Sequence, residues 1–214
     1  MSKTGLLDVI FPSRCAVCDA PGPNLCLGCD FVLEPKPHYF YRGPVNGLAA
    51  TSYSREVSSL LVAFKDRGQF ALARELGQLM DPLAQELLAL SDLSGASGQC
   101  YLVPAPSRIQ NFAKRGFLPS LLLARQLAKK VPNARVLNCL VLSSEVRDQV
   151  GLSSAERISN LEGSMSLNQS VAGKTVFLVD DVVTTGATIR EAWKTLSLGG
   201  AIVLGALVVS EARA

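Results

Sequence analysis

The sequence has little of what several reaction classes require. His38 is its one histidine, which excludes mechanisms that need two histidines, and we interpret it as a structural residue. Although 48% of the residues are hydrophobic, no run of eighteen apolar residues lacks a charge or turn signal, so no segment is expected to span a membrane. No block of five or more Lys and Arg occurs, so charge gives no indication of a nucleic-acid-binding stripe.

The beginning of the chain lacks a further feature. Residues 1–11 contain no continuous apolar stretch followed by a small-residue cleavage site, so no secretory signal is expected and the predicted location is the cytoplasm. A net charge of +3 suits phosphorylated small molecules. The 214 residues fit one main domain with a small attachment. Composition changes between residues 43 and 47, which predicts a cysteine segment over 1–45 and an α/β domain over 46–214.

Four of the six cysteines form two Cys-x-x-Cys pairs separated by seven residues. This spacing is typical of a structural zinc site with four thiolate ligands, here Cys15, Cys18, Cys26 and Cys29. Pro21-Gly22-Pro23 between the pairs allows the chain to reverse. A reducing cytosol disfavours stable disulfides, although a disulfide pair or a site that no longer binds metal remains an alternative. Cys100 and Cys139 lie in apolar runs and are predicted to be core residues.

The remainder of the chain alternates between two hydrophobic periodicities. Spacings of three and four predict helices over 55–64, 70–90, 118–130 and 190–198, with Pro82 kinking or splitting the second. Short apolar, β-branched runs predict strands over 100–103, 134–142, 174–179 and 201–209, the last buried on both faces. Alternating strands and helices predict a doubly wound, mostly parallel sheet, which binds ligands at the carboxyl ends of its strands.

The strongest functional signal follows the strand predicted over 174–179. This strand is expected to end in Asp180 and Asp181, before a hydroxyl-rich turn and a helix that opens at about Thr188. Backbone N–H groups and hydroxyls of such a turn form a phosphate site beside the positive end of the helix. The predicted phosphate-binding residues are Val183, Thr184, Thr185, Gly186, Ala187 and Thr188.

The two acids have a different role from the turn, because carboxylates repel phosphate. They are expected to face hydroxyls or a hydrated divalent cation, so a ribose 5-phosphate fits both halves of the motif. Capping of the turn is the simpler alternative, but a cap needs only one short side chain. Gly173-Lys174-Thr175 imitates the end of a P-loop. Asn168 stands where such a loop needs glycine, and the segment opens a strand instead of a helix, which excludes it.

Residues 179–188 resemble the phosphoribosyl pyrophosphate motif of type I phosphoribosyltransferases, and nearly the whole chain resembles the ComF family of competence-associated proteins. The wider resemblance rests on the paired cysteines and on further segments: Phe64-Lys65-Asp66-Arg67-Gly68, Leu102-Val103-Pro104-Ala105-Pro106, Lys114-Arg115-Gly116-Phe117, and Gln149-Val150-Gly151-Leu152-Ser153 with Arg157 and Asn160. The chain departs from the family pattern at Leu118-Pro119 and Ser164-Met165, which leaves the acceptor unspecified.

The resemblance implies a type I phosphoribosyltransferase fold and a set of site residues. Asp180 and Asp181 would contact ribose hydroxyls, and the turn would hold the 5-phosphate. The pyrophosphate loop would consist of Pro104, Ala105, Pro106 and Arg108. The implied reaction displaces magnesium pyrophosphate from ribose C1, with Arg108, Lys114 and Arg115 neutralising the leaving group. We count Arg115 with the two acids as catalytic, although these basic residues, like Arg147, Gln149 and Arg157, have surface solvation as an alternative.

Two functions of different classes follow. The first is a phosphoribosyltransferase that moves phosphoribosyl from phosphoribosyl pyrophosphate, with magnesium, to a nitrogen acceptor. The second is a non-catalytic nucleotide-binding module of the ComF type that acts in DNA uptake through a protein partner. The neighbours of the paired cysteines are Pro, Asp and Leu in place of basic and stacking aromatic residues, so direct nucleic-acid binding is not indicated. Sequence does not indicate the oligomeric state.

Overall fold

The computed structural model describes residues 14–93, 99–107, 112–113, 115–143 and 161–212. Its helices are α2 (Leu27–Val32), α3 (Arg55–Lys65), α4 (Ala73–Leu79), α5 (Asp81–Leu93), α7 (Pro119–Ala128) and α9 (Ala187–Leu198), with a short 3₁₀ turn η1 (Phe70–Leu72). Its strands are β1 (His38–Arg42), β2 (Val45–Ser52), β3 (Cys100–Pro104), β4 (Ala134–Val136), β5 (Leu140–Leu142), β6 (Met165–Leu167), β7 (Thr175–Val183) and β8 (Ile202–Glu211). Within these described residues, no helix combines the length and apolarity needed to cross a bilayer.

Six strands form the main sheet, in the order β1-β2-β8-β7-β3-β4. Every neighbouring pair is parallel except the β1–β2 hairpin. The predicted mostly parallel sheet is thereby confirmed. The hairpin spans the boundary predicted at residues 45 and 46, so β1 joins the sheet of the α/β domain. Strands β5 and β6 form a separate antiparallel pair.

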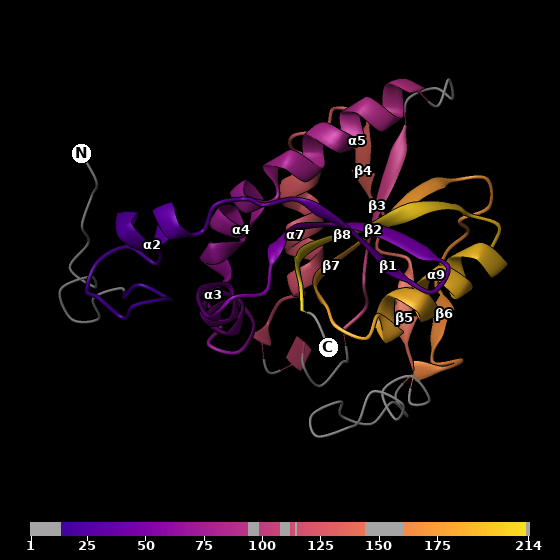
Figure 1. The fold of residues 1–214 in the computed structure, drawn as a ribbon. Helices are drawn as coiled ribbons and strands as arrows, with labels where there is room; N and C mark the ends of the chain where they lie inside the picture. Colours follow the sequence, from indigo (N-terminus) through magenta and orange to yellow (C-terminus); the bar gives the residue numbers. More distant parts are fainter. Residues whose placement is uncertain (1–13, 94–98, 108–111, 114, 144–160, 213–214) are drawn as a thin grey trace.

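Helices cover both faces of the sheet, as predicted for a doubly wound fold. Alternate residues of β7 point to opposite faces, so Phe177 and Val179 join one hydrophobic cluster, and Val176 and Leu178 join the other. The first cluster contains side chains of α3, α4, α5 and α7, and the second those of α9, β5 and β6. Figure 1 shows α3 and α4 on one side of the sheet and α9 with β5 and β6 on the other.

Helix boundaries follow from capping and from proline. Helix α3 begins after Ser54, whose side chain accepts a hydrogen bond from the backbone N–H of Val57. The helix predicted over 70–90 is split into η1, α4 and α5, with a break at Met80. Pro82 is the second residue of α5, where its missing N–H costs no intrahelical bond. The predicted split at Pro82 is therefore confirmed.

The prediction of a single strand over 134–142 is wrong. Residues 134–136 form β4, which pairs with β3, whereas residues 140–142 form β5, which pairs with β6 in the second sheet. Between them, the N–H of Cys139 donates to the carbonyl of Leu137 in a tight turn. Because β3 pairs with β4 through only three residues, the chain leaves the main sheet at this edge. Hydrophobicity alone does not reveal such a change of partner.

The strand predicted to end before Asp180 is also longer than expected. Strand β7 continues through both acids to Val183, because β8 keeps pairing with it up to Glu211. Pairing with β3 stops at Val179, so the acids lie where β7 has a neighbour on one side only. Helix α9 begins at Ala187, next to the opening predicted at about Thr188. The start of β8 is not buried on both faces, since Ile202 and Leu204 are exposed.

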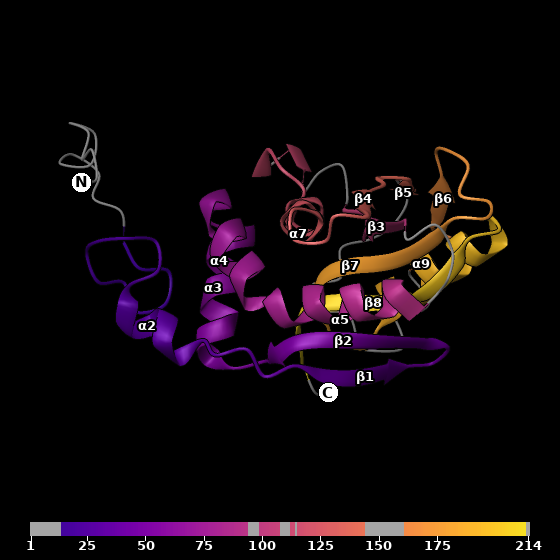
Figure 2. The same cartoon turned by 90° about the horizontal axis from the view of Figure 1, so that it is seen from above.

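The cysteine segment lies at one end of the molecule. Figures 1 and 2 agree that α2 lies beyond α3 and far from α9. Ala16 and Leu33 of this segment are buried against the cluster that contains α3 and α4. Cys100 and Cys139 are buried in the α/β core, as predicted. The segment is therefore attached to the domain by apolar contacts as well as by the chain.

Candidate functional site

The predicted acids lie at the carboxyl edge of the parallel sheet, between two loops. The side chain of Asp181 is 7% exposed, and Asp180 is partly buried. Successive residues of a strand point to opposite faces, so Asp181 faces α3 and Asp180 faces the side of α9. Each carboxylate accepts a hydrogen bond from the next backbone N–H, at 2.9 Å for Asp180 and 2.6 Å for Asp181. Their remaining oxygen positions can contact a ligand.

The predicted pyrophosphate loop begins next to these acids. Pro104 pairs with Val179 in the sheet, and the N–H of Ala105 donates to the carbonyl of Val179 at 2.8 Å. The Ser120 hydroxyl, at the start of α7, donates to the carbonyl of Ala105 at 2.6 Å. The structure thus brings residues 104–107 beside the acids at the same edge. Arg108 lies outside the described residues.

Lys65 is the nearest cation to the acids among the described residues. Its Nζ lies 2.6 Å from Oδ2 of Asp181. Burial alone would lower the pKa of Lys65, but the negative charges of Asp181 and Asp180 outweigh burial and raise it. The lysine is therefore charged at neutral pH and neutralises part of the acid pair in the absence of a ligand. A bound cation or a ribose would compete with it for Asp181.

Asp180 lies in an environment that disfavours its charged form. Burial raises the pKa of Asp180 to about 7, the negative charge of Asp181 adds to this rise, and Lys65 opposes it. Because the two carboxylates are adjacent, the negative charge of one disfavours ionisation of the other. Near neutral pH, Asp180 therefore exchanges its proton readily and can accept a hydrogen bond or a cation once a ligand neutralises the site.

This raised pKa predicts a pH-dependent stability. The folded pKa of Asp180 lies above its unfolded value of 3.8, so the stabilisation is complete below pH 3.8 and is lost as the pH rises through 7. Asp180→Asn removes this loss. The excess of the variant over the wild type in unfolding free energy should grow by about 3 kcal/mol between pH 5 and pH 8. Denaturant unfolding at both pH values measures this; an equal difference at both would contradict the assignment.

The predicted phosphate turn connects β7 to α9. Gly186 has a left-handed φ of 75°, and a Cβ built there would lie 2.6 Å from Cβ of Arg42. Arg42 Nε donates to the carbonyl of Thr184, and Arg190 Nη1 donates to the carbonyl of Thr185, both at 2.8 Å. The turn is thus packed on β1 and anchored to α9, with glycine required at its tightest point.

Arg42 belongs to a charged cluster on β1 and the end of β8. One of its terminal nitrogens lies 2.6 Å from a carboxylate oxygen of Glu211, and Nε2 of His38 lies 3.1 Å from the other. Glu211 is buried and pairs in register with Val183. The one histidine of the sequence therefore contacts Glu211 and the carbonyl of Lys36, not the acids. Pairing with two basic side chains offsets the cost of burying this carboxylate.

Arg115 is brought near the acids through Asp66. A terminal nitrogen of its guanidinium lies 2.9 Å from Oδ1 of Asp66, the residue after Lys65. The ring of Phe117 packs against Phe64 of α3, with centroids 5.5 Å apart, which holds this segment over the end of the helix. The remaining basic and polar candidates, Lys114, Arg147, Gln149, Arg157 and Asn160, lie outside the described residues.

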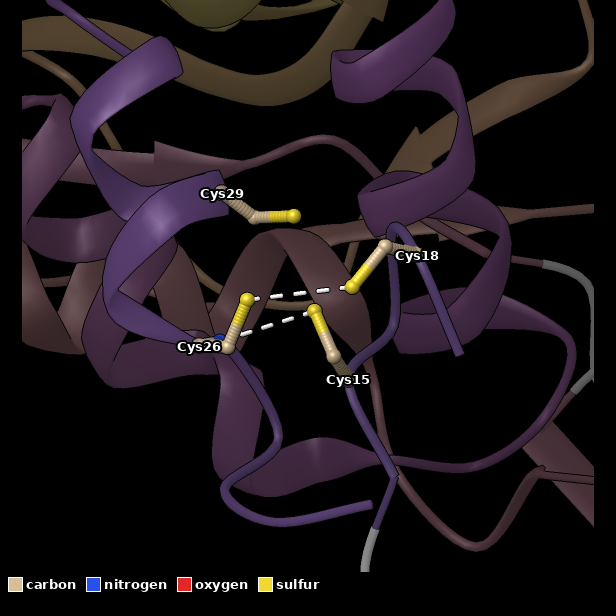
Figure 3. Close-up of side chains that lie close together, drawn as sticks. All are labelled: Cys15, Cys18, Cys26 and Cys29. Atoms are coloured by element: carbon tan, nitrogen blue, oxygen red, sulfur yellow. Dashed lines mark hydrogen bonds between the residues drawn. The ribbon is translucent and has the colours of Figure 1, made fainter. Parts of the chain in front are cut away.

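The four predicted zinc ligands converge on one point. Their sulfur atoms all lie within 4.8 Å of one another, and the Cys18 and Cys26 sulfurs are 3.7 Å apart. An ideal tetrahedral zinc with Zn–S bonds of about 2.3 Å separates its sulfurs by about 3.8 Å. Figure 3 shows the four side chains pointing toward a common centre. All four cysteines are free thiols, so the disulfide alternative is absent from this cluster.

The backbone around the cluster stabilises thiolate. Burial would raise the pKa of Cys15, but N–H groups of Cys18, Cys26 and Val17 donate to its sulfur and lower the pKa to about 6. The Cys26 donor lies 3.5 Å away. Burial and the neighbouring thiols raise the pKa of Cys29. The cluster therefore offers the Cys15 thiolate readily, whereas a bound cation would favour ionisation of Cys29, as in a metal site.

Three residues at this site carry no sequence signal that would have indicated their position. Arg42, Arg190 and Glu211 occupy ordinary strand or helix positions, and only the fold brings them to the turn. Lys65 occurs in one of the segments that resemble the family, but nothing in its local pattern places it on Asp181. Contacts between residues distant in sequence follow from strand order, which local periodicity does not fix.

Comparison with known proteins identifies the family of the chain. Residues 113–214 match the phosphoribosyl transferase domain. The chain is 30% identical over 190 residues to DNA utilization protein YhgH of Salmonella typhimurium, covering 88% of this chain and 80% of that protein. It is 29% identical over 147 residues to Competence protein F of Haemophilus influenzae, covering 67% and 63%. A crystal structure of adenine phosphoribosyltransferase aligns with 86% of this chain and 89% of its own, at 17% identity and a TM-score of 0.42. The sheet and its helices have the type I phosphoribosyltransferase fold, and the cysteine cluster lies in an added amino-terminal segment. The chain belongs to the ComF-type phosphoribosyltransferase family.

Proposed function

We propose that this protein binds phosphoribosyl pyrophosphate with magnesium and transfers its phosphoribosyl group to a nitrogen acceptor. The observation that carries the proposal is the position of Asp180 and Asp181, at the carboxyl end of β7 between the Thr184–Thr188 turn and the loop after β3. Parallel sheets of this kind bind ligands at that edge. The acids lie between a site for a 5-phosphate and a site for a pyrophosphate, where a ribose would fit.

The charges of the site suit such a donor. Carboxylate oxygens are ligands that magnesium prefers, and Asp181 is already paired with a cation, Lys65. Magnesium bound with the donor would neutralise charge on the departing pyrophosphate. In the transfer, the bond from C1 to the pyrophosphate oxygen breaks with its electron pair on the oxygen. A new bond then joins C1 to the acceptor nitrogen, which releases its proton to the solvent. Arg115, held beside Asp66, is positioned to approach the leaving group.

The cysteine cluster serves a structural role in this proposal. We propose zinc as its ion, because four thiolates in a tetrahedral arrangement are typical of a structural zinc site. Four protein ligands leave no position for a substrate or a water molecule. Helix α2 has no buried residue of its own, so metal binding would supply the folding energy that this small segment cannot obtain from a core.

Donor binding is the first property to test. Titration of phosphoribosyl pyrophosphate with magnesium into the wild type should give saturable heat, and the double variant Asp180→Ala, Asp181→Ala should give none. The reason is that the variant removes both carboxylates that we propose to contact the ribose or the cation. Isothermal titration calorimetry measures both, with circular dichroism to verify the fold.

A charge-matched control separates this effect from a change in net charge. Glu34 and Asp81 are exposed, and Asp81 pairs with Lys130 instead of with a residue of the site, so Glu34→Ala with Asp81→Ala changes the charge equally and should bind as the wild type does. A folded wild type that gives no heat would refute the donor site. Release of pyrophosphate in the presence of nitrogen acceptors would then distinguish transfer from binding alone.

A specific surface favours the second function, a nucleotide-binding module that works in DNA uptake through a protein partner. Helix α2 exposes Leu27, Phe31 and Val32, with Leu27 87% exposed. A cavity of about 320 Å³ lies between α2 and helices α3 and α4, and its lining includes Leu33, Leu60, Leu79, Asp30 and Glu75. Two relatives are named for DNA utilization and competence. Binding of the donor without pyrophosphate release by any acceptor would support this alternative.

A further inference from the structure

We infer that Arg42 and Arg190 are positioning residues that fix the orientation of two peptide groups in the phosphate turn. The inference rests on the proposed function, because it assigns the turn as the phosphate site. Arg42 donates to the carbonyl of Thr184 and Arg190 to the carbonyl of Thr185, each at 2.8 Å. The two arginines come from β1 and α9, so they hold the turn from two separate elements.

The direction of the amides follows from peptide geometry. In a planar trans peptide, the C=O and the N–H of the same unit point in opposite directions. The described residues contain no cis peptide bond. The N–H of Thr185 therefore points away from Arg42, and the N–H of Gly186 points away from Arg190. Within the described part of the chain, neither N–H has a hydrogen-bond acceptor. Two donors with no partner, fixed side by side, form an anion site.

Arg42 itself does not serve as the phosphate ligand. Its three guanidinium nitrogens donate to the carbonyl of Thr184, the carbonyl of Tyr41 and the carboxylate of Glu211, at 2.8, 2.9 and 2.6 Å. Glu211 balances its charge, and His38 contacts the other oxygen of Glu211. The stem of Arg42 lies against Gly186, on the side of the turn that β1 covers. The arginine therefore acts on a ligand only through the backbone of the turn.

The planar guanidinium explains why arginine is needed here. The planar fork of arginine donates at once to the carbonyls of Thr184 and Tyr41 and to the carboxylate of Glu211. Lysine keeps the charge, but its single nitrogen cannot reach all three acceptors. A charge role would therefore survive Arg42→Lys, whereas a positioning role would not. This difference provides the test.

The experiment titrates ribose 5-phosphate and, separately, inorganic pyrophosphate into the wild type, Arg42→Lys and Arg190→Lys. Arg74→Lys, at an exposed arginine of α4, is the control. Each turn variant should weaken ribose 5-phosphate binding about tenfold, the effect expected from losing one oriented hydrogen bond to a charged group. Pyrophosphate binding and the Arg74→Lys control should stay within about twofold of the wild type. Equal loss of both ligands, or unchanged ribose 5-phosphate binding in the turn variants, would overturn the inference.

A second readout separates the inference from the proposed function. Without ligand, the ¹H–¹⁵N resonances of Thr185 and Gly186 should shift in Arg42→Lys, while those of core strands stay in place. If the wild type binds neither compound, the proposed function fails, and these resonances alone decide the inference. Unchanged resonances at both positions would overturn it. Arg190→Lys, whose arginine is partly exposed, covers the case in which Arg42→Lys does not fold.

Discussion

Gly186→Ala should abolish donor binding and lower the unfolding free energy by about 2–4 kcal/mol. Two effects add at this position. The backbone has a φ of 75°, which an L side chain adopts at a cost, and the new Cβ would lie 2.6 and 2.7 Å from Cβ and Cγ of Arg42. These atoms are fixed on β1, so relief requires the turn to move away from the strand. Calorimetric titration and denaturant unfolding measure the two losses.

Gly173→Ala is the matched control for this substitution. Gly173 has a φ of 70°, but a Cβ built there meets nothing within 4 Å. Alanine at position 173 would have the same unfavourable positive φ as alanine at position 186, but no steric clash. Gly173 lies at the other end of β7. The control should lose about 1 kcal/mol and bind the donor like the wild type. Equal effects of the two substitutions would show that close packing on Arg42 does not determine the shape of the turn.

Removal of the metal should unfold the cysteine segment while leaving the α/β domain folded. The wild type should contain one zinc per chain, and Cys29→Ser or a strong chelator should remove it. Apparent binding energies of structural zinc in small peptides are about 10–16 kcal/mol, far more than the few buried side chains of residues 14–35 can replace. Metal analysis gives the stoichiometry. Limited proteolysis should then cleave this segment and spare the six-stranded sheet.

A cysteine of the core, Cys139, provides the control for the zinc prediction. Cys139→Ala removes a thiol from the core, where the side chain is fully buried and burial raises the pKa of the thiol to about 11. This variant should lose some stability through the cavity but keep one zinc. Loss of zinc in Cys139→Ala, or its retention in Cys29→Ser, would be incompatible with the four-cysteine site.

The local sequence patterns were sufficient for most elements and for the central motif. Helical periodicity and Pro82 predicted α3, α4 and α5, because amphipathic faces and a missing N–H act over a few residues. The Cys-x-x-Cys spacing predicted a convergence of four sulfurs that the structure contains. The acids and the turn of residues 180–188 are contiguous, so their proximity to one another was already determined by the chain.

Strand partners and distant contacts depended on the tertiary structure. Whether residues 134–142 form one strand, and whether β7 ends before Asp180, depends on how far β3 and β8 extend beside them. The pairing of Lys65 with Asp181 depends on where α3 packs on the sheet. Strand ends and distant contacts of this kind depend on the order of the strands in the sheet. That order is a property of the whole fold, and each residue contributes only a small part of the energy that determines it.

The sequence by itself determined the fold class, the cysteine cluster and the acid and glycine motif, because each rests on residues close together in the chain. Only the tertiary structure decided how that motif is supported. Arg42 of β1 and Glu211 of β8 are separated by 169 positions, yet they form an ion pair behind the phosphate turn. Hydrogen bonds between strands bring them together, and these bonds involve backbone groups that every residue carries, so no local pattern indicates the pair.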